Sequence, residues 1–469
     1  MSEIKFCPYC GEKLGNGMAF CPYCGKKLPS QSSAPKVEEK KVAPVEKKPI
    51  VVFGDILSEV ERNLTKVVVP NGVKIIGEMA FRRNETVREV ILPEGVIEIR
   101  DGAFFNCVNL SNINLPKSLQ KIGRRAFEGC ASITNLSFGE NLTEVGDGAF
   151  HGCEKLKEAV FISKLVGLGA KAFAGCKALS KVVLPEGLQR LETDLFLDCP
   201  NLSDITLPSS ITAIPKRAFA SLPIHSINIK GATTIGEEAF KGCASLSKVE
   251  VGNLTTIGKG AFEHCTSLGS FPFPSSLTYI GDHAFFGSGL TSVTLGNDVT
   301  YIGDAFCATA ITSFSVPLKA ANTAKVGYCK FLRSLSLPSG MKTIPDLAYA
   351  SNPCLTSLSI PSSVTSIGAG AFQYNKSLSS VSIPTGVNKI DMMTFAGCPS
   401  LRDLYVPASV KIVAGDAFYG DSALSVHYAG SRDEMFASRG WALPYAYGVK
   451  EIRCRDGLYD EAFRRSKFR

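Results

Sequence analysis

The chain has 469 residues, of which 45% are hydrophobic and 20% are charged, and it contains 43 Gly and 25 Pro. This composition is typical of a β-rich, turn-rich protein with a sizeable core, and it argues against the three separate globular domains that the length alone suggests. The net charge of +8 lies mostly at the two ends of the sequence, in residues 1–49 and 450–469. The central residues are nearly neutral, so we expect no phosphate-binding surface for nucleic acid on the body of the protein.

No targeting or membrane-spanning segment is expected. The first residues, MSEIKFCPYCG, lack the charged and apolar regions of a secretory signal. Residues 347–375 are free of charge, but Pro353, Pro361 and many Ser, Thr and Asn interrupt their apolar character. We therefore expect no membrane span and a reducing compartment, the cytoplasm.

Residues 1–28 contain a duplicated metal-binding pattern, Cys7-Pro-Tyr-Cys10-Gly and Cys21-Pro-Tyr-Cys24-Gly. Each copy predicts a tight turn that points two thiolates at one centre, and two such turns supply the tetrahedral sulfur set that Zn²⁺ prefers. Four thiolates leave no open position for water, so the predicted cofactor is one structural Zn²⁺ rather than a catalytic ion. A redox CxxC and an iron site are the alternatives. The segment resembles the small zinc-ribbon domains that precede many bacterial multidomain proteins.

The next two segments are predicted to be a linker and a cap. Residues 29–49 lack aromatic residues and are dense in Lys, Glu, Pro and Ser, which indicates a disordered linker. Residues 50–64 are predicted to be an N-terminal helical cap over the first coil of the following domain. The prediction depends on four apolar side chains that fall on one helical face: Ile56, Leu57, Val60 and Leu64.

A repeat with a period of 23 residues, shortened in some copies, fills residues 65–428. The aromatic position of its Ala-Phe pair marks sixteen units: Phe81, Phe104, Phe127, Phe150, Phe173, Phe196, Phe219, Phe240, Phe262, Phe285, Phe306, Val326, Tyr349, Phe372, Phe395 and Phe418. A period in this range over most of a chain predicts a solenoid of about sixteen coils. The coil of Val326 loses its aromatic plug, so we expect a local bend or loop in residues 317–330.

Each part of the repeat has a physical role. Val182 and Leu184 alternate with outward residues in a short predicted strand, and Pro185 ends that strand because proline cannot donate to a ladder. Leu188 and Leu191 are predicted to fill the core from the opposite wall, and the Ala-Phe pair to plug the middle of the coil. The consensus LxxIxLPxxLxxIGxxAFxxC resembles the BspA-like leucine-rich repeat family. The resemblance implies a β-rich leucine-rich repeat solenoid, and proteins of this family are often surface adhesins that bind host proteins.

Residues 429–469 are predicted to be a C-terminal cap and basic tail. Ser431-Arg-Asp-Glu434 has the pattern of a capping box that opens a short helix. The segment from HYAGSRDEMF to VKEIRCRDG is similar to the closing element that follows these repeats. The tail ends with four basic residues: Arg464, Arg465, Lys467 and Arg469.

Cysteines recur three residues after the aromatic position: Cys107, Cys130, Cys153, Cys176, Cys199, Cys243, Cys265, Cys329 and Cys398. Other coils carry a different small polar residue there: Asn84, Ser288, Thr309, Asn352 and Asn375. The position therefore accepts side chains that can hydrogen-bond locally to the backbone. We interpret these cysteines as buried structural thiols rather than as metal ligands, a disulfide ladder or nucleophiles.

The sequence contains no recognisable catalytic pattern and no catalytic residue is assigned. Its histidines occupy different positions in their coils, and it has no G-x-S-x-G, phosphate loop or repeated calcium motif. The outward strand positions are charged in the first coils and become a stripe of Ser and Thr from Ser292 to Ser382. We expect a non-enzymatic scaffold for protein–protein interaction, tethered to a zinc ribbon, whose partner is a protein. The alternatives are a nucleic-acid-associated protein, which would use the ribbon and the basic tail, and an adhesin.

Overall fold

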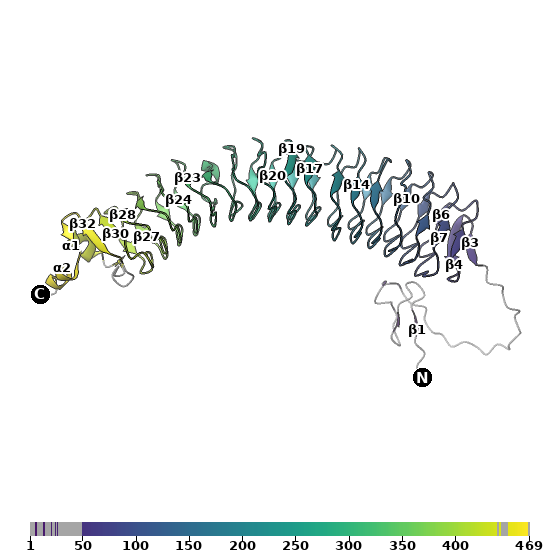
Figure 1. The fold of residues 1–469 in the computed structure, drawn as a ribbon, viewed down its shortest axis with the longest axis horizontal. Coiled ribbons are helices and arrows are strands. Elements are labelled where there is room, and N and C mark those ends of the chain that lie inside the picture. The colour runs from purple at the N-terminus through teal and green to yellow at the C-terminus, as the bar shows by residue number, and fades with distance from the viewer. Residues whose placement is uncertain are drawn as a thin grey trace. The chain divides into compact units, whose positions relative to one another are not determined.

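The structure, a computed structural model, describes residues 5–6, 13–14, 20, 24, 26, 49–438, 440–441 and 449–467. The chain divides into two units, Met1–Lys48 and Pro49–Arg469. In the first unit, strand β1 (Lys5–Phe6) pairs antiparallel with β2 (Lys13–Leu14). The second unit is a β-solenoid whose coils stack side by side in one curved row (Figure 1), which confirms the predicted fold class.

The first row of strands comes from the segment before the proline position of the repeat, which Pro185 occupies in its coil. Val182 stands opposite Ala159 on one side and Ile205 on the other, in parallel register. Burial alternates along these strands as the sequence predicts, with Val182 buried. The strands of this row are β5 (Lys66–Val68), β7 (Glu89–Ile91), β9 (Asn112–Ile113), β12 (Glu158–Val160), β14 (Lys181–Val183), β15 (Asp204–Thr206), β17 (Ser226–Ile229), β19 (Lys248–Val251), β22 (Ser313–Ser315), β23 (Ser334–Ser336), β26 (Ser380–Ser382), β28 (Asp403–Val406), β30 (Ser425–Tyr428), β32 (Glu451–Cys454) and β33 (Gly457–Leu458).

The second row comes from the residues before the glycine of the repeat. Ile122 is paired with Ile99 and Val145 in the neighbouring coils, again in parallel register. The strands of this row are β3 (Ile50–Phe53), β4 (Ile56–Val60), β6 (Ile75–Ile76), β8 (Glu98–Ile99), β10 (Lys121–Ile122), β11 (Glu144–Val145), β13 (Gly167–Leu168), β16 (Ala213–Ile214), β18 (Thr234–Ile235), β20 (Thr256–Ile257), β21 (Tyr279–Ile280), β24 (Thr343–Ile344), β25 (Ser366–Ile367), β27 (Lys389–Ile390), β29 (Ile412–Val413) and β31 (Gly440–Trp441).

The third side of the coil, which we call the Ala-Phe wall, comprises the residues from three before to two after each aromatic position. It contains turns rather than strands. The N–H of Phe127 donates to the carbonyl oxygen of Ala149 in the next coil at 2.7 Å. Arg125 and Gly129, at φ 53° and 74°, also donate their N–H groups to the next coil. This left-handed conformation recurs on both sides of the aromatic residue, and it turns alternate N–H groups of the wall in the same direction.

The core is a column of stacked aromatic rings. Phe127 lies 5.0 Å from Phe104 and 5.4 Å from Phe150, measured between ring centroids, with 5° between the ring planes in both pairs. All three side chains are fully buried. The Ala-Phe plug predicted from the repeat therefore forms one continuous hydrophobic core along the second unit.

The coil of Val326 is rearranged rather than simply looped out. A 3₁₀ helix, η1 (Leu318–Ala320), replaces the strand of the second row, and it brings Ala320 and Ala324 into the core. Val326, at the aromatic position, is fully buried with them, so this coil builds its part of the core from small side chains instead of a ring. The predicted irregularity of residues 317–330 is thus a compact turn of the chain.

The Tyr349 side chain carries a hydroxyl into the apolar column. The residue is fully buried, its Oη has no hydrogen-bond partner among the described residues, and burial raises the pKa of the phenol. Because Tyr349→Phe removes an unsatisfied polar atom, we expect it to stabilise the protein by about 1–2 kcal/mol in urea unfolding. Tyr279→Phe, at a position that is 40% exposed, is the control and should change little. Destabilisation by Tyr349→Phe would show that the hydroxyl has a partner.

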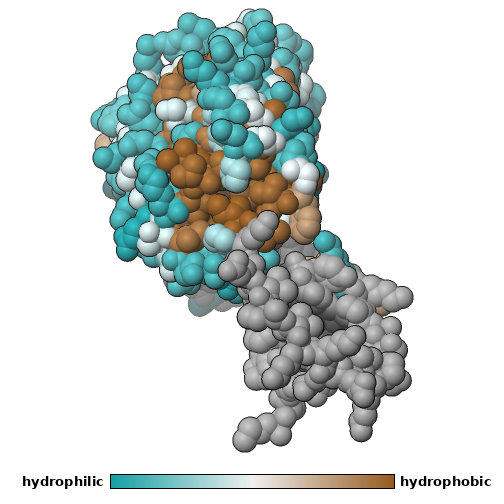
Figure 2. All heavy atoms as spheres, turned by 90° about the vertical axis from the view of Figure 1, so that its right-hand side faces the viewer, coloured by the Kyte–Doolittle hydropathy of each residue, from teal (hydrophilic) through white to brown (hydrophobic). Residues whose placement is uncertain are grey.

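The predicted N-terminal helical cap is wrong. Residues 50–60 form an antiparallel hairpin of β3 and β4 that turns at Gly54, and β4 continues the second row by pairing with β6. The β-branched residues Ile50, Val51 and Val52 favour a strand, and the existing row offers their hairpin a sheet to join. Figure 2 shows apolar side chains gathered on the end of the unit that begins with this hairpin.

The predicted C-terminal capping box is confirmed. Helix α1 (Arg432–Ala437) begins after Ser431, whose Oγ accepts the N–H of Glu434 at 3.1 Å, and the Glu434 carboxylate accepts the N–H of Ser431 at 2.7 Å. A second short helix, α2 (Glu461–Ser466), follows β33 and is capped by Asp460. None of the described helices is long and apolar enough to cross a membrane.

Candidate functional site

Three of the four predicted zinc ligands, Cys7, Cys10 and Cys21, lie outside the described residues. Cys24 is half-buried in a turn. Strands β1 and β2 pair with each other and flank the first cysteine pair in sequence. A pair of short antiparallel strands on either side of one CxxC, together with a turn at Cys24, fits a site with four thiolate donors, and such a donor set suits Zn²⁺.

The cysteines of the coils form a column of buried thiols. Cys130 Sγ donates to the carbonyl oxygen of Phe104 at 3.1 Å, and Cys153 Sγ donates to that of Phe127 at 3.3 Å. Asn375 uses its Nδ2 in the same way, toward the carbonyl oxygen of Tyr349 at 3.0 Å. The thiols and the amides therefore serve one purpose, which is to satisfy a buried carbonyl group of the preceding coil.

These thiols are poor nucleophiles, because burial disfavours the thiolate and raises the pKa of Cys153 well above its usual value and that of Cys199 to about 12. We expect a thiol reagent to modify the coil cysteines of the native protein only as fast as the coils open, with little acceleration between pH 7 and 9. Mass spectrometry of the labelled protein measures this, and the half-buried Cys354 is the reactive control. Rapid native labelling of Cys153 would contradict the assignment.

Asp421 occupies the cysteine position in the coil of Phe418. Its Oδ1 accepts the N–H of Cys398 at 2.6 Å, and its Oδ2 is buried without a partner among the described residues. Asn375, at the equivalent position, donates from its Nδ2 to two carbonyl oxygens. A carboxylate cannot donate there, and burial raises the pKa of Asp421 to about 7.

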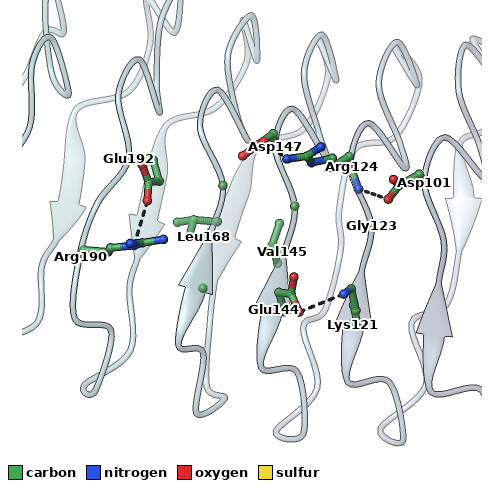
Figure 3. A pocket seen from close by; sticks show the side chains of 13 residues that line it. Asp101, Lys121, Gly123, Arg124, Glu144, Val145, Asp147, Leu168, Arg190 and Glu192 are labelled. Atoms are coloured by element: carbon green, nitrogen blue, oxygen red, sulfur yellow. Dashed lines mark hydrogen bonds and ion pairs between the residues drawn. The ribbon is translucent and has the colours of Figure 1, made fainter. Parts of the chain in front are cut away.

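A hollow of about 430 Å³ opens on the second strand row (Figure 3). Its position follows from the outward column at 23-residue intervals, in which Gly167 supplies no side chain between Glu144 and Arg190. The floor is a second column of glycines. A Cβ atom on Gly146 would lie 2.6 Å from the backbone nitrogen of Arg124, so the close approach of neighbouring coils requires glycine at this place.

The walls of the hollow carry charges that are already paired. Lys121 Nζ lies 3.2 Å from a carboxylate oxygen of Glu144, and Arg190 Nε lies 2.9 Å from one of Glu192. None of the described residues that line the hollow carries a hydroxyl, thiol or imidazole. Since exposed ion pairs contribute about 0–1 kcal/mol each, a polar partner can exchange into them at little cost. The arrangement suits recognition of a polar surface that carries charges of both signs.

The first strand row presents a long solvent-exposed face. In its early coils, ion pairs join neighbouring strands, as between Lys66 and Glu89 at 3.0 Å. Farther along, the serines of β22 stand opposite those of β23, and their side chains are exposed. At the end of this row, His427 Nε2 lies 2.7 Å from Asp403 Oδ1. The predicted change from a charged face to a hydroxyl-bearing face is therefore present in the structure.

The sequence did not point to the hollow. Its signal is visible only when the repeats are aligned at their 23-residue period, because Gly167 then interrupts a column of charged residues, Lys121, Glu144 and Arg190. A single glycine at an outward position has no meaning in an isolated repeat. Its effect depends on two neighbouring coils.

The family comparison matches the described fold. The profile described as "BspA type Leucine rich repeat region (6 copies)" matches residues 59–178, 121–245, 233–326 and 304–425, and a zinc-ribbon domain profile matches residues 6–28. No curated protein sequence matches the chain.

The chain is also similar to three solved structures. A leucine-rich cell surface protein from Faecalibacterium prausnitzii is 24% identical, with 86% of this chain and 99% of that chain covered and a TM-score of 0.35. A leucine-rich repeat protein from Bacteroides ovatus is 21% identical, with 82% and 100% covered and a TM-score of 0.48. A leucine-rich repeat protein from T. pallidum is 27% identical, with 44% and 91% covered and a TM-score of 0.35.

Proposed function

The chain belongs to the BspA-type leucine-rich repeat family and has an N-terminal zinc-ribbon domain, and from this membership we propose that it is a non-enzymatic scaffold that binds another protein. The observation that carries the proposal is the row of strands from β5 to β32, whose outward side chains are presented to solvent. Solenoids use such long surfaces for recognition, because their stacked coils place many side chains in register.

The experiment that tests this function is affinity capture with the full chain as bait. A matched bait carries Ser315→Arg and Ser336→Arg, which places bulky charges on the exposed strand face of β22 and β23 without altering the buried positions. A protein that the full chain retains and the matched bait releases supports the scaffold. Retention of nucleic acid alone would favour the alternative that uses the basic residues of α2, Arg464 and Arg465.

The proposal includes a reducing compartment, the cytoplasm. Four thiolates for a metal and a column of reduced, buried thiols in the coils are both compatible with it. Surface labelling of intact cells with a reagent that does not cross membranes tests this placement. Labelling of the chain would favour the adhesin alternative, in keeping with the cell-surface description of the similar F. prausnitzii protein.

We further propose that Cys7, Cys10, Cys21 and Cys24 hold one structural Zn²⁺. When bound, the ion would link the two CxxC turns of a segment too small to have a large core. Its four thiolates would hold the ribbon folded, and the ribbon would then act as a compact module joined to the solenoid by residues 29–49.

The expected result is one tightly held zinc ion per full-length chain, measured by elemental analysis after dialysis against a weak chelator. Replacing Cys7 and Cys10 with Ser should abolish it, because two thiolates do not complete a tetrahedral site. The fragment 29–469 is the control and should retain no zinc. Zinc bound to that fragment would mean that cysteines of the solenoid are the ligands.

A further inference from the structure

Exposed apolar side chains are distributed unevenly along the Ala-Phe wall. Among the described residues, no large hydrophobic side chain of this wall is exposed in the coils from Phe81 to Phe306. Each of the last five coils exposes one: Tyr328 (56%), Leu347 (47%), Tyr374 (46%), Met392 (57%) and Tyr419 (62%). We call these five side chains the aromatic stretch. Tyr and Met are enriched at protein interfaces, so the stretch has the composition of a docking surface.

Two of the three tyrosines of this surface, Tyr328 and Tyr374, occupy one column. The N–H of Tyr328 donates to Ala350, that of Ser351 to Gln373, and that of Tyr374 to Ala396, so Tyr328, Ser351 and Tyr374 take the same place in successive coils. Tyr328 and Tyr374 are thus two coils apart, or about 10 Å at about 4.8 Å per coil. An α-helix repeats one side-chain direction every seven residues, over about 10.5 Å, and therefore matches this interval.

The side chains are held against glycines of the following coil. A Cβ atom on Gly397 would lie 2.4 Å from Cδ1 of Tyr374, and one on Gly370 would lie 2.7 Å from Cδ2 of Leu347. Tyr374 and Leu347 therefore lie over backbone that has no side chain of its own. Contact with backbone restricts them before a partner arrives, which lowers the entropy cost of binding.

The charged side chains that follow Tyr328 and Tyr374 are basic, and they make no ion pair within the described part of the chain. Lys330 and Lys376 each follow a tyrosine by two residues, are exposed, and make no ion pair with a described residue. In an earlier coil, by contrast, Lys241 pairs with Glu238 at 2.9 Å and with Glu263 at 3.0 Å.

The acidic side chains of the last coils are engaged internally. Asp346 Oδ1 accepts the N–H of Ala369 at 2.8 Å, and Asp391 Oδ2 pairs with Lys389 Nζ at 2.8 Å. Both come before the aromatic position of their coils, whereas Lys330 and Lys376 come after it. The surface next to the two tyrosines is therefore apolar and positively charged.

From this distribution we infer that the aromatic stretch is a docking site for an acidic amphipathic helix of a partner protein, with the helix lying along the solenoid axis. Apolar residues seven positions apart would contact Tyr328 and Tyr374, and flanking carboxylates would pair with Lys330 and Lys376. The inference rests on the proposed scaffold function, and it names a surface and a partner chemistry for it.

The test uses two synthetic peptides of eighteen residues with leucines on one helical face. One carries Glu on its other positions and its twin carries Lys. Fluorescence anisotropy with the full-length chain at low salt should show at least tenfold tighter binding of the Glu peptide. Tyr328→Ser with Tyr374→Ser should weaken that binding at least tenfold, and Lys330→Glu with Lys376→Glu should reverse the preference.

Tyr405→Ser, which removes a tyrosine that is 49% exposed on the strand face, is the matched control and should bind the Glu peptide normally. Circular dichroism of each variant confirms that it remains folded. Equal binding of the twin peptides, or no effect of the Tyr328 and Tyr374 substitutions, would overturn the inference. A dimer in sedimentation velocity that these substitutions abolish would also overturn it, because a second copy would then be the occupant. If captured partners persist while the Glu peptide fails, the docking site is wrong and the scaffold function stands.

Discussion

Replacement of Phe173 with Ala is expected to destabilise the solenoid by about 3–5 kcal/mol. Phe173 is fully buried, and its ring lies between those of Phe150 at 5.2 Å and Phe196 at 6.1 Å. Truncation removes its buried apolar area and leaves a cavity that two neighbouring coils share. Because each coil is stabilised mainly by its neighbours, the loss should spread to both sides of the substitution.

Urea unfolding measures the loss of stability, and amide hydrogen exchange shows its spread. We expect faster exchange in the coils of Phe150 and Phe196, and little change in the coil of Phe395. Phe53→Ala, at a position that is 70% exposed in the N-terminal hairpin, is the control and should cost far less. A melting curve for Phe173→Ala that matches the unsubstituted chain would refute the continuous core.

Replacement of Asp421 with Asn is expected to stabilise the protein at pH 8 by about 2–4 kcal/mol and to change little at pH 4. The buried carboxyl of Asp421 has a pKa raised to about 7, whereas an unfolded aspartate titrates near its usual value of about 3.9. The folded chain therefore keeps the proton over a range in which the unfolded chain releases it. The free energy of unfolding should fall as pH rises from about 4 to 7, by about 1.4 kcal/mol per pH unit at most.

Asparagine removes this titration and can donate to the buried carbonyl groups, as Asn375 does at the same position two coils earlier. Urea unfolding at pH 4.5, 6 and 8 compares the two chains, and their stabilities should diverge with rising pH. The Cys398 thiol, which belongs to the residue whose N–H bonds Asp421, stays neutral in this range because burial raises its pKa to about 12. Asn375→Asp is the matched control and should introduce a similar dependence on pH. Parallel profiles for Asp421→Asn and the unsubstituted chain would contradict the prediction.

The repeat predicted most of the fold because each residue of a coil has one role in every coil. The alternation around Val182 gave the first strand row, and the regular Phe positions gave the aromatic column. The N-terminal cap was mispredicted because residues 50–64 belong to no repeat, and their apolar spacing fits a helical face as well as a hairpin. Pairing of β4 with β6 favours the hairpin over the helix. The sequence of residues 50–64 alone does not show that β6 is available for this pairing.

The candidate surfaces were less predictable than the fold. The zinc ligands stand out because CPYCG occurs twice within a short segment. The hollow beside Gly167 and the aromatic stretch from Tyr328 to Tyr419 depend on which side chains become neighbours across coils. Packing places little constraint on the outward residues of a solenoid, so these surfaces leave no periodic pattern in the sequence. Exposure had to be known before either surface could be recognised.

The left-handed residues of the Ala-Phe wall give the solenoid a polarity. Since the N–H groups of this wall point toward the C-terminal coils, their peptide dipoles add along the axis, as they do in an α-helix but with the positive end at the C-terminal side. The first coil of the wall consequently offers carbonyl oxygens and the last offers N–H groups. The N-terminal end therefore requires hydrogen-bond donors. The hairpin supplies one there, because the N–H of Val60 donates to the carbonyl oxygen of Ala80 at 3.1 Å. A cap that satisfies the groups of one end therefore cannot satisfy those of the other. A solenoid of this kind can be lengthened by inserting coils, but its two caps cannot be exchanged.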